Sequence, residues 1–199
     1  MSVSRSGTLY VVATPIGNLG DLTVRAAEIL TSVDLIAAED TRHTRILLQH
    51  IGVSKRLFSL HQHNERARSR QIIDSLLRGE NIALVSDAGT PLISDPGYLL
   101  VRDCLARGLP VLTVPGASAV TAALAVCGLP TDRFAFEGFL PSRLSARRRM
   151  LQDLAQEPRT LVFFESPRRL KATLADMVWV LGGVRRVSVL RELTKRFEE

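Results

Sequence analysis

The chain has 199 residues, of which 46% are hydrophobic, and a formal net charge of +6 at neutral pH. This hydrophobic content is sufficient for a folded core and argues against a largely disordered chain. No apolar run approaches the roughly 20 residues that a membrane-spanning helix requires, and the polar segment 1–7 is not followed by the apolar core of a signal peptide, so we expect a cytoplasmic protein without a membrane segment.

The first two thirds of the sequence alternate strand patterns with helical patterns. Short β-branched and apolar runs predict strands at 8–13, 34–38, 56–61, 81–85 and 110–114. Apolar residues at helical spacing predict helices at 22–33, 44–51, 64–79 and 117–126, with a further helix that ends near Gly108. This alternation is typical of a mostly parallel sheet that is covered by helices on both faces.

A polar segment rich in proline and glycine, 128–133, interrupts this alternation. Beyond it the pattern starts again, with strands predicted at 134–138, 160–164 and 187–190 and helices predicted at 144–155 and 167–181. We therefore expect two α/β domains, an amino-terminal domain at 1–129 and a carboxy-terminal domain at 130–199.

The cysteine, histidine and basic residues indicate little by themselves. Cys104 and Cys127 lie in apolar helical patterns, which favours reduced thiols over a disulfide or a metal site. The four histidines have no recognised zinc spacing, so no metal is expected. All but three of the 26 basic residues are arginine; the surplus permits a polyanionic partner, and a bias in amino-acid usage would explain it equally well.

Three loops that follow predicted strands have the composition of ligand-binding loops. They are TPIGNLGD at 14–21, SDAGTPLISDPG at 86–97 and PGASA at 115–119. Open α/β sheets bind ligands at the carboxyl ends of their strands, and glycine lets the backbone approach a ligand closely. The loops contain no Walker, GxGxxG or GxSxG motif, so ATP hydrolysis, standard dinucleotide binding and a serine nucleophile are poor interpretations.

Two polar segments, AEDTRHT at 38–44 and FFESPRR at 163–169, also follow predicted strands. A carboxylate next to arginine in such a place suits the anchoring of a substrate. The alternative is a salt bridge at the start of a helix, either Asp40 with Arg42 or Glu165 with Arg168. For Asp40 the two interpretations are balanced, and for Glu165 the functional one is favoured.

Arg143, Arg147, Arg148 and Arg149 form a basic cluster at the start of a predicted helix. A solvated helix face is the favoured interpretation, and a patch that contacts phosphates is the alternative.

Taken together, these segments resemble a known family. GTLYVVATPIGNLGDLT, AEDTRHT, HNE, SDAGTPLISDPG, VPGASA, FEGFLP, FFESPRR and RELTK occur in one order from Gly7 to the end of the chain. The series is similar to that of the bacterial 16S rRNA (cytidine-2′-O)-methyltransferases, the ribosomal members of the tetrapyrrole-methylase-like superfamily. The resemblance implies two α/β domains of that type with S-adenosyl-L-methionine bound between them, a homodimer, and 16S rRNA of the small ribosomal subunit as partner.

The resemblance also assigns roles to individual residues. It implies cofactor contacts from the three loops, at Ile16, Ala88, Gly89, Thr90, Ile93, Ser118 and Ala119. Chains of the family usually continue beyond RELTKRFEE, so the second domain is expected to be incomplete at its carboxyl terminus, without some of the usual cofactor contacts.

Methyl transfer to a ribose hydroxyl requires an acceptor for the hydroxyl proton. We predict Glu165 as this acceptor, with Asp87 as the second candidate. Arg42, Arg168 and Arg169 are predicted to bind the phosphates of the RNA. Two alternatives remain: a C-methyltransferase of the same fold that acts on a precorrin-like tetrapyrrole, and a non-catalytic RNA-binding module.

Overall fold

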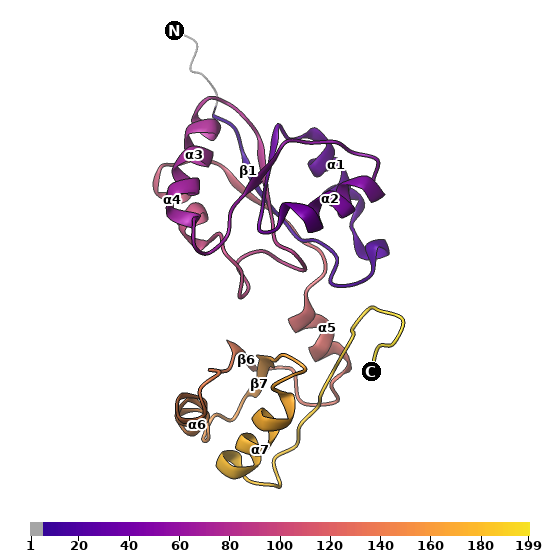
Figure 1. Ribbon diagram of the computed structural model, residues 1–199, viewed down its shortest axis with the longest axis vertical. Helices are drawn as coiled ribbons and strands as arrows, with labels where there is room; N and C mark the ends of the chain where they lie inside the picture. Colours follow the sequence, from indigo (N-terminus) through magenta and orange to yellow (C-terminus); the bar gives the residue numbers. More distant parts are fainter. Residues whose placement is uncertain (1–5) are drawn as a thin grey trace. The chain divides into compact units, whose positions relative to one another are not determined.

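The computed structural model describes residues 6–199 (Figure 1). Most of the polar segment 1–7, on which the prediction about a signal peptide depends, lies outside the described residues. The chain divides into two compact units. The first extends to Ala119 and includes Glu192–Glu198, and the second comprises Val120–Arg191 with Glu199.

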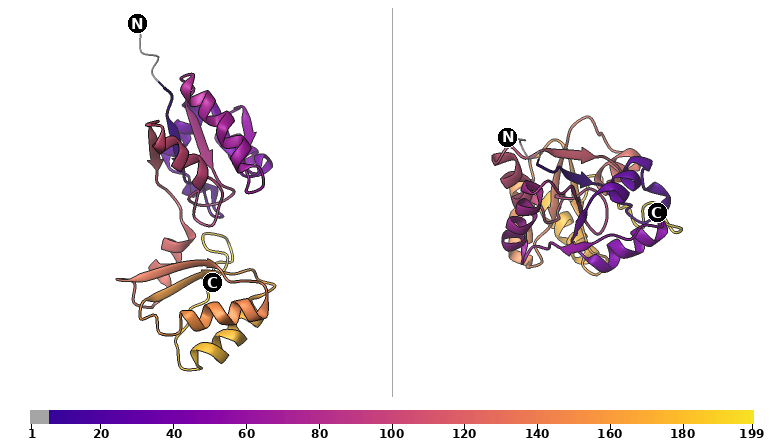
Figure 2. Two further views of the ribbon diagram at one scale, coloured as in Figure 1. Left: turned by 90° about the vertical axis from the view of Figure 1, so that its left-hand side faces the viewer. Right: turned by 90° about the horizontal axis from the view of Figure 1, so that it is seen from above.

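The first unit contains a five-stranded, fully parallel sheet (Figure 2). Its strands are β1 (Leu9–Val12), β2 (Leu35–Ala38), β3 (Leu57–Ser59), β4 (Ile82–Val85) and β5 (Val111–Val114), in the order β3-β2-β4-β1-β5. All residues of β2 and β4 are buried, as expected for strands that are covered on both faces. Each of the five strands lies at a position predicted from the sequence.

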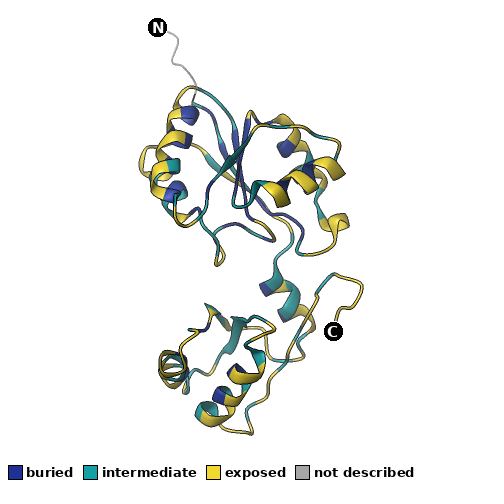
Figure 3. Ribbon diagram, in the orientation of Figure 1, coloured by how far each residue is buried: buried dark blue, intermediate teal, exposed yellow. Residues whose placement is uncertain are grey.

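Helices cover both faces of this sheet. Alternate residues of each strand point to opposite sides, so each face presents apolar residues for a helix to cover. Leu35 and Ala37 of β2 pack in a cluster with residues of α3 (Glu65–Leu77) and α4 (Tyr98–Ala106), whereas Ile36 and Ala38 pack with residues of α1 (Val24–Ser32) and α2 (Thr41–His50). Figure 3 shows the buried residues along these strands and on the inner sides of the helices.

The helix α5 (Ala119–Val126) contributes to neither core cluster of the sheet. The expected domain boundary lies between residues 129 and 130, whereas the compact units divide between Ala119 and Val120, so most of α5 belongs to the second unit. Both faces of that sheet are occupied by other helices.

The second unit contains two parallel strands, β6 (Phe134–Phe139) and β7 (Thr160–Phe164), and the helices α6 (Leu144–Asp153) and α7 (Leu170–Leu181). Arg147 of α6 and Asp176 of α7 are buried and form an ion pair of 2.6 Å, and Arg148 donates to the same carboxylate at 2.7 Å. The predicted solvated helix face is therefore wrong for Arg147. An arginine can occupy this interior position because a carboxylate neutralises its charge there.

The strand predicted at 187–190 is absent, and these residues have no regular secondary structure. A β-branched run becomes a strand only when a neighbouring strand provides backbone hydrogen bonds, and within residues 6–199 the sheet of the second unit consists of β6 and β7. Among the same residues, no helix has the length and apolar character needed to span a membrane.

Glu65 connects two helices and a loop in the first unit. Its buried carboxylate accepts backbone hydrogen bonds from Gly97 and Leu99, both at 2.9 Å. These N–H groups lie at the start of α4, where the helix leaves such donors unpaired and favours a negative charge. Glu65 therefore joins the start of α3 to the start of α4 and to the end of the loop 86–97.

Replacing Glu65 by alanine should lower the free energy of unfolding by about 2–3 kcal/mol, because two buried N–H groups lose a charged acceptor. Glu65→Gln retains an oxygen and should cost about 1 kcal/mol. Urea unfolding followed by circular dichroism measures both. The exposed Glu28→Ala on α1 is the control and should change the value by less than about 0.5 kcal/mol; a similar loss in Glu65→Ala and the control would contradict the anchoring role.

Candidate functional site

The loops that leave β1 and β4 meet at the carboxyl edge of the first sheet. β1 and β4 are neighbours, but the connection from β1 leads toward β2 and that from β4 leads toward β5, on opposite sides. Ligands bind at such a switch point in open α/β sheets. Here Thr14 and Gly89 exchange backbone hydrogen bonds of 2.9 and 3.0 Å, which join the loops 14–21 and 86–97.

The loop that leaves β5 joins the same place. The Thr90 hydroxyl donates to the carbonyl oxygen of Ala117 at 3.3 Å. Gly89 has a φ of +80°, and a Cβ atom built on it would lie 3.3 Å from Cγ2 of Ile16. The three loops singled out in the sequence therefore pack against one another within one unit, and Gly89 lies at their meeting point.

The loop 86–97 holds two non-glycine residues in the left-handed region, Leu92 with a φ of 74° and Ser94 with a φ of 67°. A side chain in this region costs about 1–3 kcal/mol, and such residues cluster at functional sites. The hydroxyl of Ser86 donates to the carbonyl oxygen of Ala88 at 3.4 Å and stabilises the first turn of the loop. The loop thus has a defined, strained shape.

Carboxylates gather at this edge of the sheet. The pKa of Glu39 is raised, first by burial and then by the negative charges of Asp95, Asp87 and Asp40. Burial likewise raises the pKa of Asp95. The edge therefore carries a negative potential that favours a cation. Within residues 6–199 no three histidine, cysteine, aspartate or glutamate side chains are arranged to hold a metal ion.

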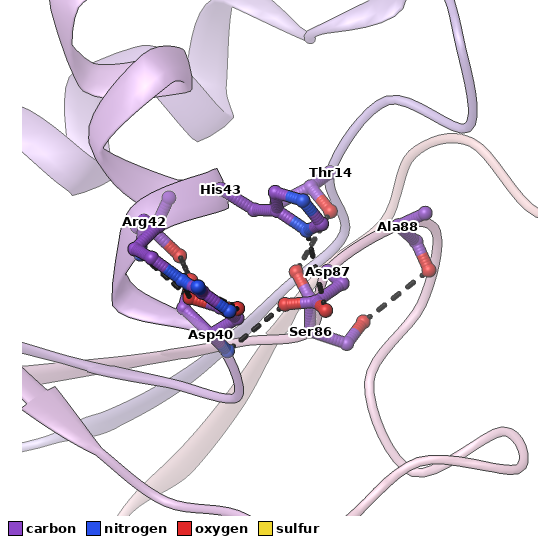
Figure 4. A network of polar contacts seen from close by, with 8 residues as sticks. Thr14, Asp40, Arg42, His43, Ser86, Asp87 and Ala88 are labelled. Carbon is purple, nitrogen blue, oxygen red and sulfur yellow. Dashed lines mark hydrogen bonds and ion pairs between the residues drawn. The ribbon is translucent and has the colours of Figure 1, made fainter.

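A network of hydrogen bonds and ion pairs joins the ends of β2 and β4 (Figure 4). Asp87 accepts from the backbone N–H of Asp40 at 2.9 Å through Oδ1, and its Oδ2 lies 3.3 Å from Nδ1 of His43. Asp40 caps α2 and holds Arg42 through its two carboxylate oxygens. The bonds to Arg42 hold the pKa of Asp40 well below its ordinary value.

His43 is a member of this network that was not among the site residues predicted from the sequence. Its position in AEDTRHT, one helical turn beyond Asp40, places it above the strand ends. For Asp40 and Arg42 the structure shows the helix-start salt bridge, at 2.6 Å, and the Arg42 side chain is exposed. The role of Arg42 in RNA binding stays a prediction.

The residues predicted to contact the cofactor lie on the three joined loops. Gly89 is buried, Ile16 and Thr90 are half-buried, and Ala88 and Ile93 are exposed. Ser118 and Ala119 are half-buried at the end of the third loop, where the first unit ends. The positions are compatible with a shared site in the first unit, and the contacts themselves stay predictions.

Glu165 lies in the second unit and has several partners there. Its carboxylate accepts from the Ser166 backbone at 2.7 Å and the Thr173 hydroxyl at 2.6 Å, and it pairs with Arg169 at 2.5 Å. Burial opposes ionisation, but these donors outweigh it and lower the pKa of Glu165. The donors hold Glu165 at the start of α7, so the structure adds a stabilising role to the predicted catalytic one.

Arg169 also donates to the carbonyl oxygen of Leu140 at 3.1 Å. Its guanidinium therefore ties α7 to the end of β6, and its predicted contact with RNA phosphates competes with these internal partners. Arg168 is exposed. The partner of Glu165 is thus Arg169, one residue beyond the arginine that the salt-bridge alternative named.

Curated relatives match nearly the whole chain. A protein from Escherichia coli O157:H7 named ribosomal RNA small subunit methyltransferase I is 57% identical over 192 residues, which cover 96% of this chain and 67% of that protein. The protein of the same name from Xylella fastidiosa (strain Temecula1) is 57% identical over 196 residues, 98% of this chain and 72% of its own length.

Solved structures share the fold at low sequence identity. The uroporphyrin III C-methyltransferase from Thermus thermophilus has a TM-score of 0.66 at 19% identity, covering 97% of this chain and 86% of that one. A diphthine synthase has a TM-score of 0.66 at 18% identity, covering 86% and 73%. These likenesses confirm the predicted α/β fold class.

The family model described as Tetrapyrrole (Corrin/Porphyrin) Methylases matches residues 8–199, and the chain therefore belongs to this methyltransferase family.

Proposed function

We propose that the protein is an S-adenosylmethionine-dependent methyltransferase that modifies the ribose 2′-hydroxyl of a cytidine in 16S rRNA. The observation that carries this proposal is the identity of 57% to proteins named ribosomal RNA small subunit methyltransferase I, over at least 96% of the chain. The proposal includes the small ribosomal subunit as partner and a homodimer, which derive from the family resemblance, and a cytoplasmic location, which was expected from the sequence.

The charge of the first unit supports the cofactor assignment, because the carboxylates at the sheet edge suit a positive charge. At Gly89 the loops pack closely, since an added Cβ atom would lie 3.3 Å from Cγ2 of Ile16. The residues that would hold the cofactor are Ile16, Ala88, Gly89, Thr90, Ile93, Ser118 and Ala119. Bound S-adenosylmethionine supplies a methyl group on a sulfonium; transfer to a hydroxyl forms a carbon–oxygen bond, leaves the electron pair of the broken carbon–sulfur bond on sulfur, and releases one proton.

The carboxylates at the carboxyl edge of the first sheet repel RNA, because RNA is a polyanion. RNA binding therefore requires positive charge at another place. Arginine is available elsewhere on the first unit. A hollow of about 240 Å³ is lined by residues of α3 and α4, namely Arg66, Ser69, Arg70, Leu99, Arg102 and Asp103. The buried Ser69 hydroxyl lacks a hydrogen-bond partner among the described residues. We infer that this hollow binds a backbone phosphate of the RNA.

The two alternatives are less well supported. A tetrapyrrole methyltransferase shares the fold, but the solved tetrapyrrole enzyme compared above is only 19% identical, and identity at that level does not indicate a substrate. A non-catalytic RNA-binding module would not require the strained loop 86–97 at the switch point of the sheet.

Incubating the protein with methyl-labelled S-adenosylmethionine and small subunits that lack the modification should place the label in 2′-O-methylcytidine. Nuclease digestion and mass spectrometry identify the labelled nucleoside. Label in a base, or label in a tetrapyrrole acid offered in parallel and none in RNA, would contradict the proposal.

Gly89→Ala should weaken binding of S-adenosylmethionine at least tenfold, about 1.4 kcal/mol, because the added methyl group enters the space beside Ile16 and strains the backbone. Calorimetric titration measures the affinity, with ATP as a ligand that should not bind. Gly108→Ala is the matched control, since Gly108 has a φ of +68° and a Cβ atom added to it would have nothing within 4 Å. Equal weakening in both variants would contradict the assignment of this loop to the cofactor.

The double variant Arg66→Gln/Arg70→Gln should bind small-subunit RNA more weakly and reduce the slope of log affinity against log salt by about one, because the hollow binds one phosphate. Filter binding over a range of salt concentrations measures this slope. Arg149→Gln/Arg186→Gln removes the same charge from exposed positions of the second unit. The same effect from both pairs would show that net charge, rather than the hollow, determines the affinity.

A further inference from the structure

His43 and Asp87 form a pair above the ends of two neighbouring strands, β2 and β4. Nδ1 of His43 lies 3.3 Å from Oδ2 of Asp87. The carboxylate is itself held from a second side, since its Oδ1 accepts from the backbone N–H of Asp40 at 2.9 Å. The histidine therefore faces a carboxylate whose position is fixed by the backbone of the adjoining segment (Figure 4).

This contact favours one protonation pattern of the imidazole ring. An ionised carboxylate has no proton to offer Nδ1 and attracts positive charge, which favours the neutral ring form that carries its proton on Nδ1. The lone pair then resides on Nε2, at the opposite edge of the ring. The His43 side chain is 61% exposed, so the ring is accessible to a large substrate.

We propose that His43 is the proton acceptor in methyl transfer and that Asp87 is its positioning residue. The inference rests on the proposed function. As the ribose 2′-oxygen bonds to the methyl carbon, the hydroxyl proton passes to Nε2 of His43. The imidazolium that forms is stabilised by the carboxylate of Asp87, and it returns to the neutral ring when Nε2 releases the proton to water.

The two acceptors predicted from the sequence fit this task less well. Asp87 uses one carboxylate oxygen for Asp40 and the other for His43. Glu165 is surrounded by three donors that lower its pKa, which makes it a weaker base. In model peptides an imidazole has a pKa of about 6.5 and a carboxyl of about 4, so imidazole takes a proton more readily near neutral pH.

The test combines activity with a measurement on the protein without ligands. His43→Ala should lower single-turnover methyl transfer by roughly 10²–10⁴-fold, and added imidazole should restore part of the rate. The affinity for S-adenosylmethionine should change less than about threefold, because no cofactor contact is removed. His50→Ala, on the same helix and also exposed, is the matched control and should retain the wild-type rate.

Long-range ¹H–¹⁵N spectra report which ring nitrogen of His43 carries the proton. The wild-type protein should show the Nδ1–H form, and Asp87→Asn should shift the population toward Nε2–H, because an amide can donate to Nδ1. An Nε2–H form in the wild-type protein would overturn the pairing.

The possible activity results separate this inference from the proposed function. Methyl transfer by His43→Ala at more than one third of the wild-type rate would overturn the role of His43 alone. A loss that imidazole does not restore, together with weakened cofactor binding, would overturn it in favour of a structural role. A wild-type protein that transfers no methyl group to RNA would overturn the proposed function and this inference together.

Discussion

Two backbone hydrogen bonds between Thr14 and Gly89 join the loops of the neighbouring strands β1 and β4, and the geometry of the candidate site depends on them. The chain leaves these two strands in opposite directions, so their loops would diverge without a direct link. The left-handed conformation of Gly89 allows the close approach, and the contact of Thr90 with Ala117 adds the third loop. Glu65 holds the far end of the loop 86–97 at the start of α4.

Charge divides the first unit into two regions with different chemistry. The carboxyl edge of the sheet carries Glu39, Asp40, Asp87 and Asp95, and the pKa of Glu39 is raised by its burial and then by the negative charges of the other three. Such an edge suits a sulfonium and does not suit a phosphate. The arginines of α3 and α4 line a hollow at another place on the same unit. Under the proposed function, the sheet edge attracts the cationic cofactor, and the arginines of the hollow attract the polyanionic substrate.

Arginine–carboxylate pairs join elements of the second unit. Asp176 accepts from two arginines of α6, and Arg148 also lies over the ring of Trp179. Arg147 and Arg169 both donate to carbonyl oxygens in the segment after β6. Several arginines that suggest RNA contacts in the sequence therefore hold this unit together, and arginine content overstates the surface available for phosphates.

The sequence by itself determined the elements, the α/β class and the family, because these depend on local patterns: apolar strand runs, helical spacing and glycine-rich loops. The sequence predicted a strand at 187–190, but none forms because these β-branched residues have no neighbouring strand. It also did not predict that Arg147 is buried, because this requires Asp176 from another helix. The pair of His43 and Asp87 was equally out of reach. The two residues lie 44 positions apart in the chain, and only the order β2-β4-β1 brings them together. Tertiary structure decided these features because the partner of each side chain comes from a distant segment.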